Sequence, residues 1–285
     1  MKFVRLGTEN GARWGVQQGD TVHHLVGSRV RAPSLTQLRN PSFQRVVREQ
    51  IAAGDLPTTP TDDTNRLAPV ADPGKIVCVG LNYHDHAAEQ DEEIPERPIL
   101  FGKAPTSVTD PGSAIVEPRD IDQLDYEVEL GVVIGRTAKH VSAAAARDYV
   151  AGYTVVHDVS ARDAQFDDGQ WFRGKSYDTF APMGPALVTE GATDPNDLTV
   201  ELRVNGKRKQ PSSTAEFIFD VDELVEYISR AMTLRPGDVI STGTPGGVGV
   251  FRDPPDLLEP GDVVEAEIED IGVLRNHVIE SQSPN

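Results

Sequence analysis

The alternation of apolar and polar residues predicts short strands at the start of the chain. Apolar positions alternate with polar ones over Lys2–Leu6, Arg13–Val16 and Thr21–Leu25, and glycine-containing turns separate these segments. Apolar residues within Leu35–Ile51 then recur at loose helical spacing, and the segment ends near Gly54. The pattern therefore predicts three strands followed by a helical segment.

The composition changes after this segment. Three prolines, together with threonine and aspartate, occupy Leu56–Pro69, which is typical of a linker. We therefore place a domain boundary here. It separates a small N-terminal domain at residues 1–68 from a larger domain at residues 69–285.

The larger domain is predicted to be rich in strands. Ser142–Val150 is expected to form a short alanine-rich helix with Ser142 as its N-cap, and an apolar stripe predicts a longer helix over Asp222–Met232. The expected strands are Lys75–Gly80, Glu127–Ile134, Tyr153–Val159, Asp238–Thr242 and a closing pair, Val263–Ile268 and Val273–Ile279. Because strands outnumber helices, we expect an α+β fold that is mainly β, and not a doubly wound sheet.

Net charge narrows the classes of partner. The 285 residues carry a formal net charge of −18, so the protein is expected to repel nucleic-acid phosphates and anionic membranes. Residues 1–68 carry +3 and the remainder −21, and the chain has 20 arginines but only 7 lysines. High acidity with arginine favoured over lysine suggests a salt-adapted, halophilic cytoplasm. A GC-rich genome would also favour arginine.

Cysteine content and hydropathy limit the location and the type of metal site. The single cysteine, Cys78, excludes an internal disulfide and a cysteine-based zinc site, and its apolar strand favours a packed thiol over a nucleophile. The chain has no apolar run of membrane-span length and no signal-peptide pattern at its start. We therefore expect a cytoplasmic protein.

Three carboxylates form the first candidate site. Glu127 and Glu129 are two residues apart in a predicted strand and so point to the same face. An exposed acidic edge would explain such a pair, but the apolar flanks indicate an interior strand that needs a compensating cation. Asp158 ends another apolar strand, and three carboxylates suit Mg²⁺ or Mn²⁺. His157 would point to the opposite face, which suggests a structural role.

The segment after the first strand of the larger domain contains a candidate acid–base pair. If it forms a helical turn, His86 and Glu89 are neighbours that can hydrogen-bond and activate water. His84 is an alternative to His86, and an exposed polar helix start would explain the segment equally simply.

Two further segments carry candidate ligand contacts. Lys175 lies between Gly174 and Ser176, but the glycine spacing of a nucleotide-binding loop is absent, so the lysine is a candidate for stabilising a carboxylate or enolate oxygen. In Thr242–Gly249, glycine N–H groups and threonine hydroxyls could approach a ligand oxygen, although a plain turn would also explain this segment.

Together, these segments resemble the fumarylacetoacetate hydrolase family. The resemblance covers roughly residues 70–280, in consistent order, and is carried by the runs K-I-V-C-V-G-L-N-Y-H-D-H-A-A-E, D-Y-E-V-E-L-G-V-V-I-G, A-G-Y-T-V-V-H-D-V-S-A-R-D, G-K-S-Y-D-T-F-A-P-M-G-P and P-G-D-V-I-S-T-G-T-P-G-G-V-G. The run Q-W-F-R-G-K-S-Y-D-T-F is most similar to the branch of fumarylacetoacetate hydrolase domain-containing proteins.

The resemblance implies a fold, an assembly and a set of site residues. The family fold is a mixed β-roll, usually assembled as a homodimer. Metal ligands would be Glu127, Glu129 and Asp158, holding Mg²⁺ with Mn²⁺ or Ca²⁺ as alternatives. The His86–Glu89 pair would orient and deprotonate water on a segment that often closes as a lid. Substrate contacts would come from Arg162, Gln165, Lys175 and Thr244.

These residues lead to a functional hypothesis. We expect a metal-dependent hydrolase that cleaves a carbon–carbon bond in an acylpyruvate, or a related small anionic 2-oxo acid, through an enolate. The alternatives are an oxaloacetate tautomerase or decarboxylase, an isomerase or dehydratase of a sugar-derived 2-oxo acid, and a non-catalytic metal-binding protein. Asp91, Glu92 and Glu93 add negative charge near the expected entrance, which disfavours anionic substrates unless salt screens it.

Overall fold

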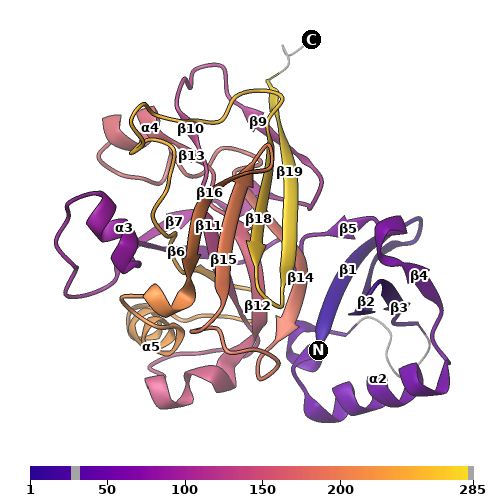
Figure 1. Ribbon diagram of the computed structural model, residues 1–285. Coiled ribbons are helices and arrows are strands. Elements are labelled where there is room, and N and C mark those ends of the chain that lie inside the picture. Colours follow the sequence, from indigo (N-terminus) through magenta and orange to yellow (C-terminus); the bar gives the residue numbers. More distant parts are fainter. Residues whose placement is uncertain (27–32, 282–285) are drawn as a thin grey trace.

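Three β-sheets make up most of the protein. The computed structural model describes residues 1–26 and 33–281 and contains a 12-stranded sheet, a five-stranded sheet and a two-stranded pair (Figure 1). The 12-stranded sheet has the order β4-β3-β2-β1-β14-β12-β11-β17-β6-β7, and β5 and β8 pair with β1 and β14. Helices are few and short, which confirms the prediction of an α+β fold that is mainly β.

The N-terminal residues form one end of the 12-stranded sheet. The strands there are β1 (Lys2–Thr8), β2 (Gly11–Gln18), β3 (Thr21–His24), β4 (Thr58–Pro60) and β5 (Arg66–Leu67). The helices α1 (Leu35–Leu38) and α2 (Pro41–Ala53) follow β3, and Asn40 caps α2 at its start. Pairing of β1 with β14 makes this sheet continuous with the strands of the larger domain.

The segment expected to be a linker is folded. Leu56–Pro69 contributes β4, a short 3₁₀ helix at Thr61–Asp63 and β5. β4 extends the edge beside β3, and β5 pairs with β1, because the main-chain groups between the prolines remain free to join the sheet.

The middle of the sheet carries the site. Its strands are β6 (Ile76–Gly80), β7 (Ile99–Lys103), β8 (Val108–Thr109), β11 (Val128–Ile134), β12 (Val150–His157), β14 (Ala181–Thr189) and β17 (Val239–Ser241). The pair of β10 (Leu124–Asp125) and β13 (Ser160–Ala161) lies at the ends of β11 and β12 that carry the candidate carboxylates.

A second sheet covers one face of these strands. It has the order β16-β15-β18-β19-β9, formed by β9 (Ala114–Glu117), β15 (Thr199–Val204), β16 (Lys207–Ser213), β18 (Val263–Ile268) and β19 (Gly272–Glu280). The predicted pairing of the last two strands is confirmed. Alternate residues of β11, such as Leu130 and Val132, enter the core with β15, β18 and α5 (Val221–Ala231). The intervening β11 positions therefore face away from this core.

Of the two helices predicted in the larger domain, one is present and the other is a 3₁₀ helix. The apolar stripe of α5 is buried as expected, and Asp220 and Glu223 form a capping box at its start. Ala143–Tyr149 instead forms a 3₁₀ helix, and the Ser142 side chain makes no capping hydrogen bond. The remaining 3₁₀ helices are Pro105–Ser107 and Thr214–Glu216.

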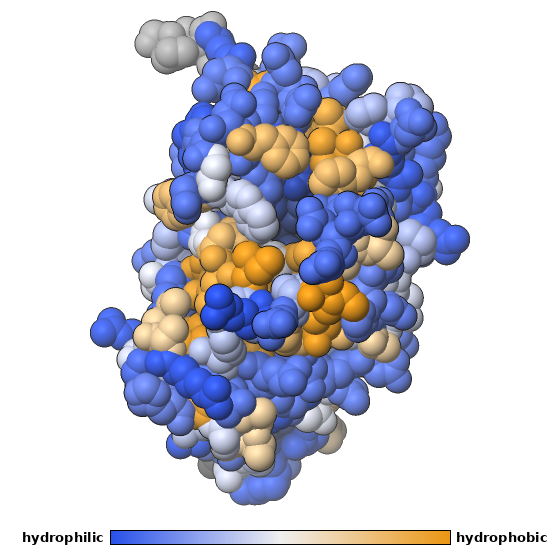
Figure 2. Space-filling model, turned by 90° about the vertical axis from the view of Figure 1, so that its left-hand side faces the viewer, coloured by the Kyte–Doolittle hydropathy of each residue, from blue (hydrophilic) through white to orange (hydrophobic). Residues whose placement is uncertain are grey.

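The site lies on the side of the molecule opposite the N-terminal strands. There α3 (His84–Glu89) and α4 (Arg162–Asp167) border one cavity, which appears as a hollow in Figure 2. Within residues 1–26 and 33–281, each helix is too short or too polar to cross a membrane.

Candidate metal centre and its acid–base pair

The three candidate carboxylates meet at one buried point. Glu127 immediately precedes β11, Glu129 lies within it, and Asp158 immediately follows its neighbour β12. Val128 and Leu130 enter the core on the opposite face, so the two glutamates share a face as predicted. One oxygen from each carboxylate lies within 4.8 Å of the others, and all three residues are buried.

Three buried cations surround these carboxylates. The Lys175 ammonium lies 2.8 Å from Glu127 Oε2 and 2.9 Å from Asp158 Oδ2. Lys103 lies 2.5 Å from Asp158 Oδ1, and an Arg162 nitrogen lies 2.6 Å from Glu127 Oε1. The cluster is therefore a mutually compensating network, in which Glu127 and Asp158 each contact two cations.

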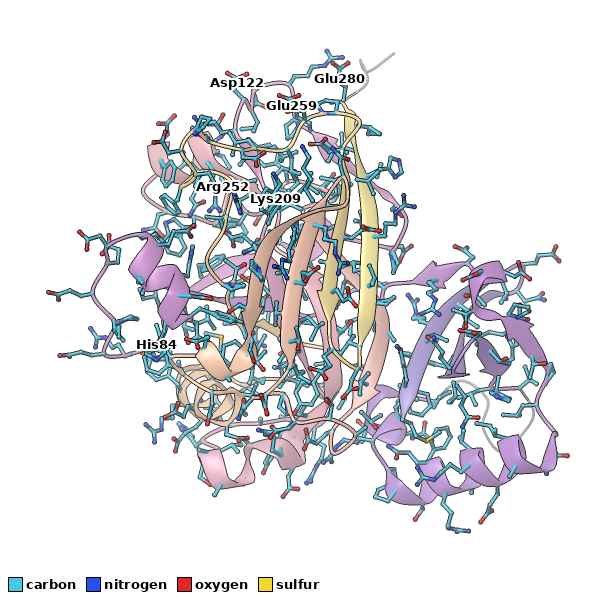
Figure 3. All side chains as sticks on the ribbon, viewed as in Figure 1. His84, Asp122, Lys209, Arg252, Glu259 and Glu280 are labelled. Atoms are coloured by element: carbon cyan, nitrogen blue, oxygen red, sulfur yellow. The ribbon has the colours of Figure 1, made fainter. Side chains whose placement is uncertain are left out.

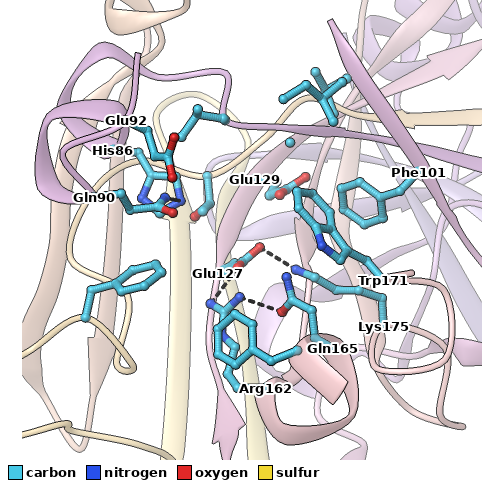
Figure 4. Close-up of a pocket in the computed structure, with 17 residues that line it drawn as sticks. His86, Gln90, Glu92, Phe101, Glu127, Glu129, Arg162, Gln165, Trp171 and Lys175 are labelled. Atoms are coloured by element: carbon cyan, nitrogen blue, oxygen red, sulfur yellow. Dashed lines mark hydrogen bonds and ion pairs between the residues drawn. The ribbon is translucent and has the colours of Figure 1, made fainter. Parts of the chain in front are cut away.

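Local backbone geometry places two of these cations. Gly174 precedes Lys175, and a side chain there would lie 2.7 Å from the Gln165 backbone nitrogen, so only glycine allows this close approach to α4. Arg162 begins α4. Its Nε donates to Asp125 at 2.8 Å, and its Nη1 donates to the side-chain oxygen Oε1 of Gln165 at 2.9 Å. Because that oxygen holds Arg162, the amide donors of Gln165 are free to face the cavity (Figure 4).

Burial and neighbouring charge separate the pKa values of the two glutamates. Burial opposes ionisation of Glu127, but Lys175 and Arg162 outweigh it and lower its pKa to about 2. Burial, together with repulsion from Asp158 and Glu127, raises the pKa of Glu129 to about 8. Burial alone would lower the pKa of Lys175, yet Asp158 and Glu127 raise it, so the lysine keeps its charge.

The donor set fits a divalent cation. Carboxylate oxygens are the ligands that Mg²⁺, Mn²⁺ and Ca²⁺ prefer, and Glu129 is the carboxylate whose negative charge the surrounding cations compensate least. The network contains four carboxylates and three cations: Asp125, Glu127, Glu129, Asp158, Lys103, Arg162 and Lys175. With all four carboxylates ionised, a divalent cation would change its net charge from one negative to one positive, which favours an anionic ligand.

Stabilisation by Mg²⁺ is expected to depend on pH. Because folding raises the pKa of Glu129 from 4.5 to about 8, its protonated form stabilises the metal-free fold below about pH 4.5, and this contribution is lost as pH rises through about 8. Mg²⁺ has to displace this proton at low pH. The rise in Tm on adding Mg²⁺ should therefore be larger at about pH 8.5 than at about pH 5.5. In Glu129→Gln, which lacks one of the three carboxylates, the rise should be small at both pH values; an equal rise in the wild type at both values would contradict the assignment.

The predicted acid–base pair is formed by α3. His86 Nδ1 lies 3.3 Å from Glu89 Oε2, and His86 Nε2 lies 2.8 Å from the side-chain nitrogen of Gln90. Gln90 can only donate to that ring nitrogen, which places the imidazole proton on Nδ1, toward Glu89. The His86–Glu89 contact that the spacing predicted is therefore present, and Nε2 is the proton acceptor of the ring.

The glycine-rich loop after β17 contacts the carboxylates of the site. Its N–H groups donate to carboxylates of the protein itself rather than to an open ligand site. Gly243 N donates to Glu129 Oε2 at 3.1 Å, and Gly247 N donates to both oxygens of Glu89 at 2.9 and 3.0 Å. Gly243 has φ +99°, which a residue with a side chain rarely adopts. The loop therefore couples the metal-ligand candidates to the acid–base pair.

Thr244 is placed by the same loop. Its hydroxyl donates to the Val128 carbonyl at 3.0 Å and accepts from Gln210 at 2.8 Å, while the residue lines the cavity. The hydroxyl hydrogen is thus already used within the protein, and a ligand would meet Thr244 through its other atoms.

Three further residues had alternative roles in the sequence, and their positions in the structure bear on those roles: His84, His157 and Cys78. His84 lies at the exposed start of α3 (Figure 3) and is not among the cavity-lining residues, whereas His86 is buried and lines it. His157 is buried, and burial together with Lys103 lowers its pKa to about 3, so it is uncharged. Cys78 is fully buried in the core, and burial raises its thiol pKa.

One cavity brings the candidate residues together. It has a volume of about 280 Å³. Its lining includes seven of the nine predicted site residues: His86, Glu127, Glu129, Arg162, Gln165, Lys175 and Thr244. The other two do not line the cavity, but Glu89 contacts His86 and Asp158 contacts Lys175. In Figure 4, His86, Gln90 and Glu92 lie on one side of Glu127, with Arg162, Gln165 and Lys175 on the other.

Several residues of the site were missed by the sequence analysis. Asp125 accepts hydrogen bonds from Arg162, Gly249 and Val250, and it continues the same alternation as Glu127 and Glu129. That alternation could have identified it. Lys103 ends an apolar strand as Asp158 does, which was a usable signal. The positions of Gln90 and Trp171 in the cavity wall had no comparable signal.

Comparisons with known proteins identify the family of this chain. The family model described as "Fumarylacetoacetate (FAA) hydrolase C-terminal" matches residues 75–279. The chain therefore belongs to the fumarylacetoacetate hydrolase family, as its motifs indicated.

Individual relatives carry differing activities in their names. "Oxaloacetate tautomerase Fahd2a, mitochondrial" of Rattus norvegicus is 48% identical over 236 residues, covering 82% of this chain and 75% of its own length. A structure titled fumarylacetoacetate hydrolase, from the psychrophilic Exiguobacterium antarcticum, has 40% identity and a TM-score of 0.86, covering 99% of this chain and 100% of that one. A 5-carboxymethyl-2-hydroxymuconate delta-isomerase from Mycobacterium smegmatis has 36% identity and a TM-score of 0.80, with the same coverage.

Proposed function

We propose that this protein is a divalent-metal-dependent enzyme that interconverts the keto and enol forms of a 2-oxo acid such as oxaloacetate. The observation that carries the proposal is the buried carboxylate triad, which shares one cavity with the His86 base and the Lys175 and Arg162 cations. The activity in the name of the rat relative supports the choice of reaction, since it is 48% identical over most of this chain. The earlier expectation of a carbon–carbon hydrolase becomes the second candidate.

The residues divide the chemistry between charge and proton transfer. A divalent cation held by Glu127, Glu129 and Asp158 would supply Lewis-acid polarisation of the keto oxygen. Lys175 and Arg162 place fixed positive charge beside these carboxylates, where negative charge develops in an enolate. His86 Nε2 accepts the proton from the carbon next to the carbonyl and returns it to the enolate oxygen to complete the enol, while Glu89 stabilises the intervening imidazolium through Nδ1. Gln90 has to yield its hydrogen bond to Nε2 for this transfer.

Hydrolysis of an acylpyruvate is the second candidate. The His86–Glu89 pair favours it, because a histidine held by a carboxylate can take a proton from water as well as from carbon. Both reactions use the same enolate-stabilising charges, so only the bond that is broken separates them.

The two candidates can be distinguished by ultraviolet absorbance. With Mg²⁺ and high KCl, we expect oxaloacetate enol absorbance to decay faster with the protein than without it, and no pyruvate to form from acetylpyruvate. Pyruvate and acetate formed from acetylpyruvate would instead support the hydrolase. Failure to accelerate either reaction would refute both.

His86 is expected to be required for turnover. Replacing it with asparagine should lower kcat by about 10²–10⁴-fold, since this is the usual contribution of a positioned general base. His84→Asn is the matched control, because His84 lies in the same helix but is exposed and outside the cavity. The enol assay should show loss in the first variant and unchanged kcat in the second; equal rates in both would exclude His86 as the base.

Assembly, domain division, location and metal identity complete the proposal. We propose a homodimer, a domain boundary near residue 68, a cytoplasmic location and a salt-adapted source, with Mg²⁺ as the metal. The support for a salt-adapted source is the composition of the chain, which contains 45 acidic residues. Sedimentation at several KCl concentrations would test the dimer and its salt dependence.

A further inference from the structure

Exposed large apolar side chains gather at the mouth of the cavity. Within residues 1–26 and 33–281, six such side chains are strongly exposed: Ile94, Ile99, Phe166, Phe172, Phe251 and Val273. Three of them line the cavity although they come from separate segments of the chain, and we call them the apolar rim: Ile99, Phe166 and Phe251. Figure 2 shows apolar patches on both sides of the hollow.

The rim is continuous with the apolar wall of the cavity. Trp171 precedes Phe172 and packs edge-on against Phe101, with ring centroids 5.1 Å apart, and both rings line the cavity. Gly80 permits this placement, since a side chain there would lie 2.5 Å from the Trp171 ring. Large exposed apolar patches usually mark a contact surface. The molecule that can touch this wall and the rim together is a ligand of the cavity.

Charge along the cavity is divided between floor and mouth. Among the described lining residues, the cations are Arg162 and Lys175, and both are at least 97% buried beside the carboxylates. The charged lining residue nearer the outside is Glu92, which is exposed. The floor therefore suits the anionic head group, while the mouth disfavours a carboxylate that extends as far as Glu92 and suits an uncharged group there.

We propose that the preferred ligand of this site is a 2-oxo acid, or its enol, that carries an apolar alkyl or aryl group beyond the reacting carbon. The head group lies at the carboxylate–cation floor, and the apolar group lies between Phe166, Phe251 and Ile99. This inference rests on the proposed function and narrows its substrate class. The cavity volume of about 280 Å³ agrees, since it approaches the lower limit of pockets that enclose drug-sized ligands, roughly 300 Å³.

A comparison of the affinities of three acids tests this inference. In the presence of Mg²⁺, the full chain is titrated calorimetrically with pyruvate, phenylpyruvate and 2-oxoglutarate. We expect phenylpyruvate to bind at least about tenfold more tightly than pyruvate, because its ring buries against the rim. 2-Oxoglutarate, which extends pyruvate by a carboxymethyl group, should gain nothing. Equal affinity for phenylpyruvate and pyruvate would overturn the inference while leaving the proposed function intact; failure of all three to bind would overturn both.

Two variants connect the preference to the rim. Phe251→Ser and Phe166→Ser should each reduce the ratio of phenylpyruvate to pyruvate affinity toward one, whereas Val273→Ser, an equally exposed apolar residue outside the cavity, should leave the ratio unchanged. Sedimentation of the same samples provides the competing outcome. If Phe251→Ser dissociates an oligomer and leaves the ratio unchanged, the rim is a contact between copies of the chain and the inference is wrong.

Discussion

Replacing Glu129 with glutamine should abolish Mg²⁺-dependent turnover. Glutamine keeps the shape of the side chain, and its carbonyl oxygen can still accept from Ser241 and Gly243, so the fold should persist. The change removes one of three carboxylates from the only such cluster in the described residues. Since metal-assisted charge stabilisation is worth several kcal/mol, we expect kcat to fall at least about 10³-fold.

Turnover and metal binding should change together in this variant. Calorimetric titration with Mg²⁺ should show strong weakening of binding in Glu129→Gln, and the enol assay should show the loss of rate. Glu96→Gln is the control, because Glu96 is exposed and outside the cavity. Retained Mg²⁺ binding with wild-type turnover in Glu129→Gln would refute the metal site.

Replacing Lys175 with methionine should damage both stability and catalysis. Its ammonium is shared between Glu127 and Asp158, so the change leaves two buried carboxylates without this partner. Breaking a buried ion pair from one side costs about 3–5 kcal/mol, and loss of a group that stabilises the enolate should lower kcat by about 10²–10³-fold. Mg²⁺ should recover part of the stability, since it supplies positive charge to the same carboxylates.

Urea unfolding with and without Mg²⁺ measures the stability effect. Lys207→Met is the control. Lys207 is exposed in β16, so its replacement removes the same charge from the protein surface. Lys175→Arg provides a second variant if methionine prevents folding: it keeps the charge, and we expect it to fold with reduced turnover because the planar guanidinium fits the site differently. Wild-type stability of Lys175→Met without Mg²⁺ would contradict the network.

Local patterns predicted much of the site. The two-residue spacing of Glu127 and Glu129 was enough to place both on one face, since side chains of a strand alternate whatever the strand pairs with. The three-residue spacing of His86 and Glu89 was enough to make them neighbours once α3 formed. Asp125 lay within reach of the same argument and was missed.

Predictions that depended on distant partners were less reliable. Leu56–Pro69 has the composition of a linker, yet its strands pair with β1 and β3, which lie far away in the sequence. Ser142 has the residue type of an N-cap, but the segment forms a 3₁₀ helix without that bond. The glycines of Thr242–Gly249 left open a ligand loop or a plain turn, and the acceptors of their N–H groups include Glu129 and Glu89.

The sequence by itself determined the family, the mainly β architecture and the identity of the groups that carry chemistry. These follow from residue type and short spacing, which the backbone converts directly into faces and neighbours. Only the tertiary structure decided which charges compensate one another: Lys103 and Lys175 with Asp158, and Arg162 with Glu127. It also decided where the apolar rim lies, because Ile99, Phe166 and Phe251 come from separate segments that only the folded chain brings to one cavity mouth.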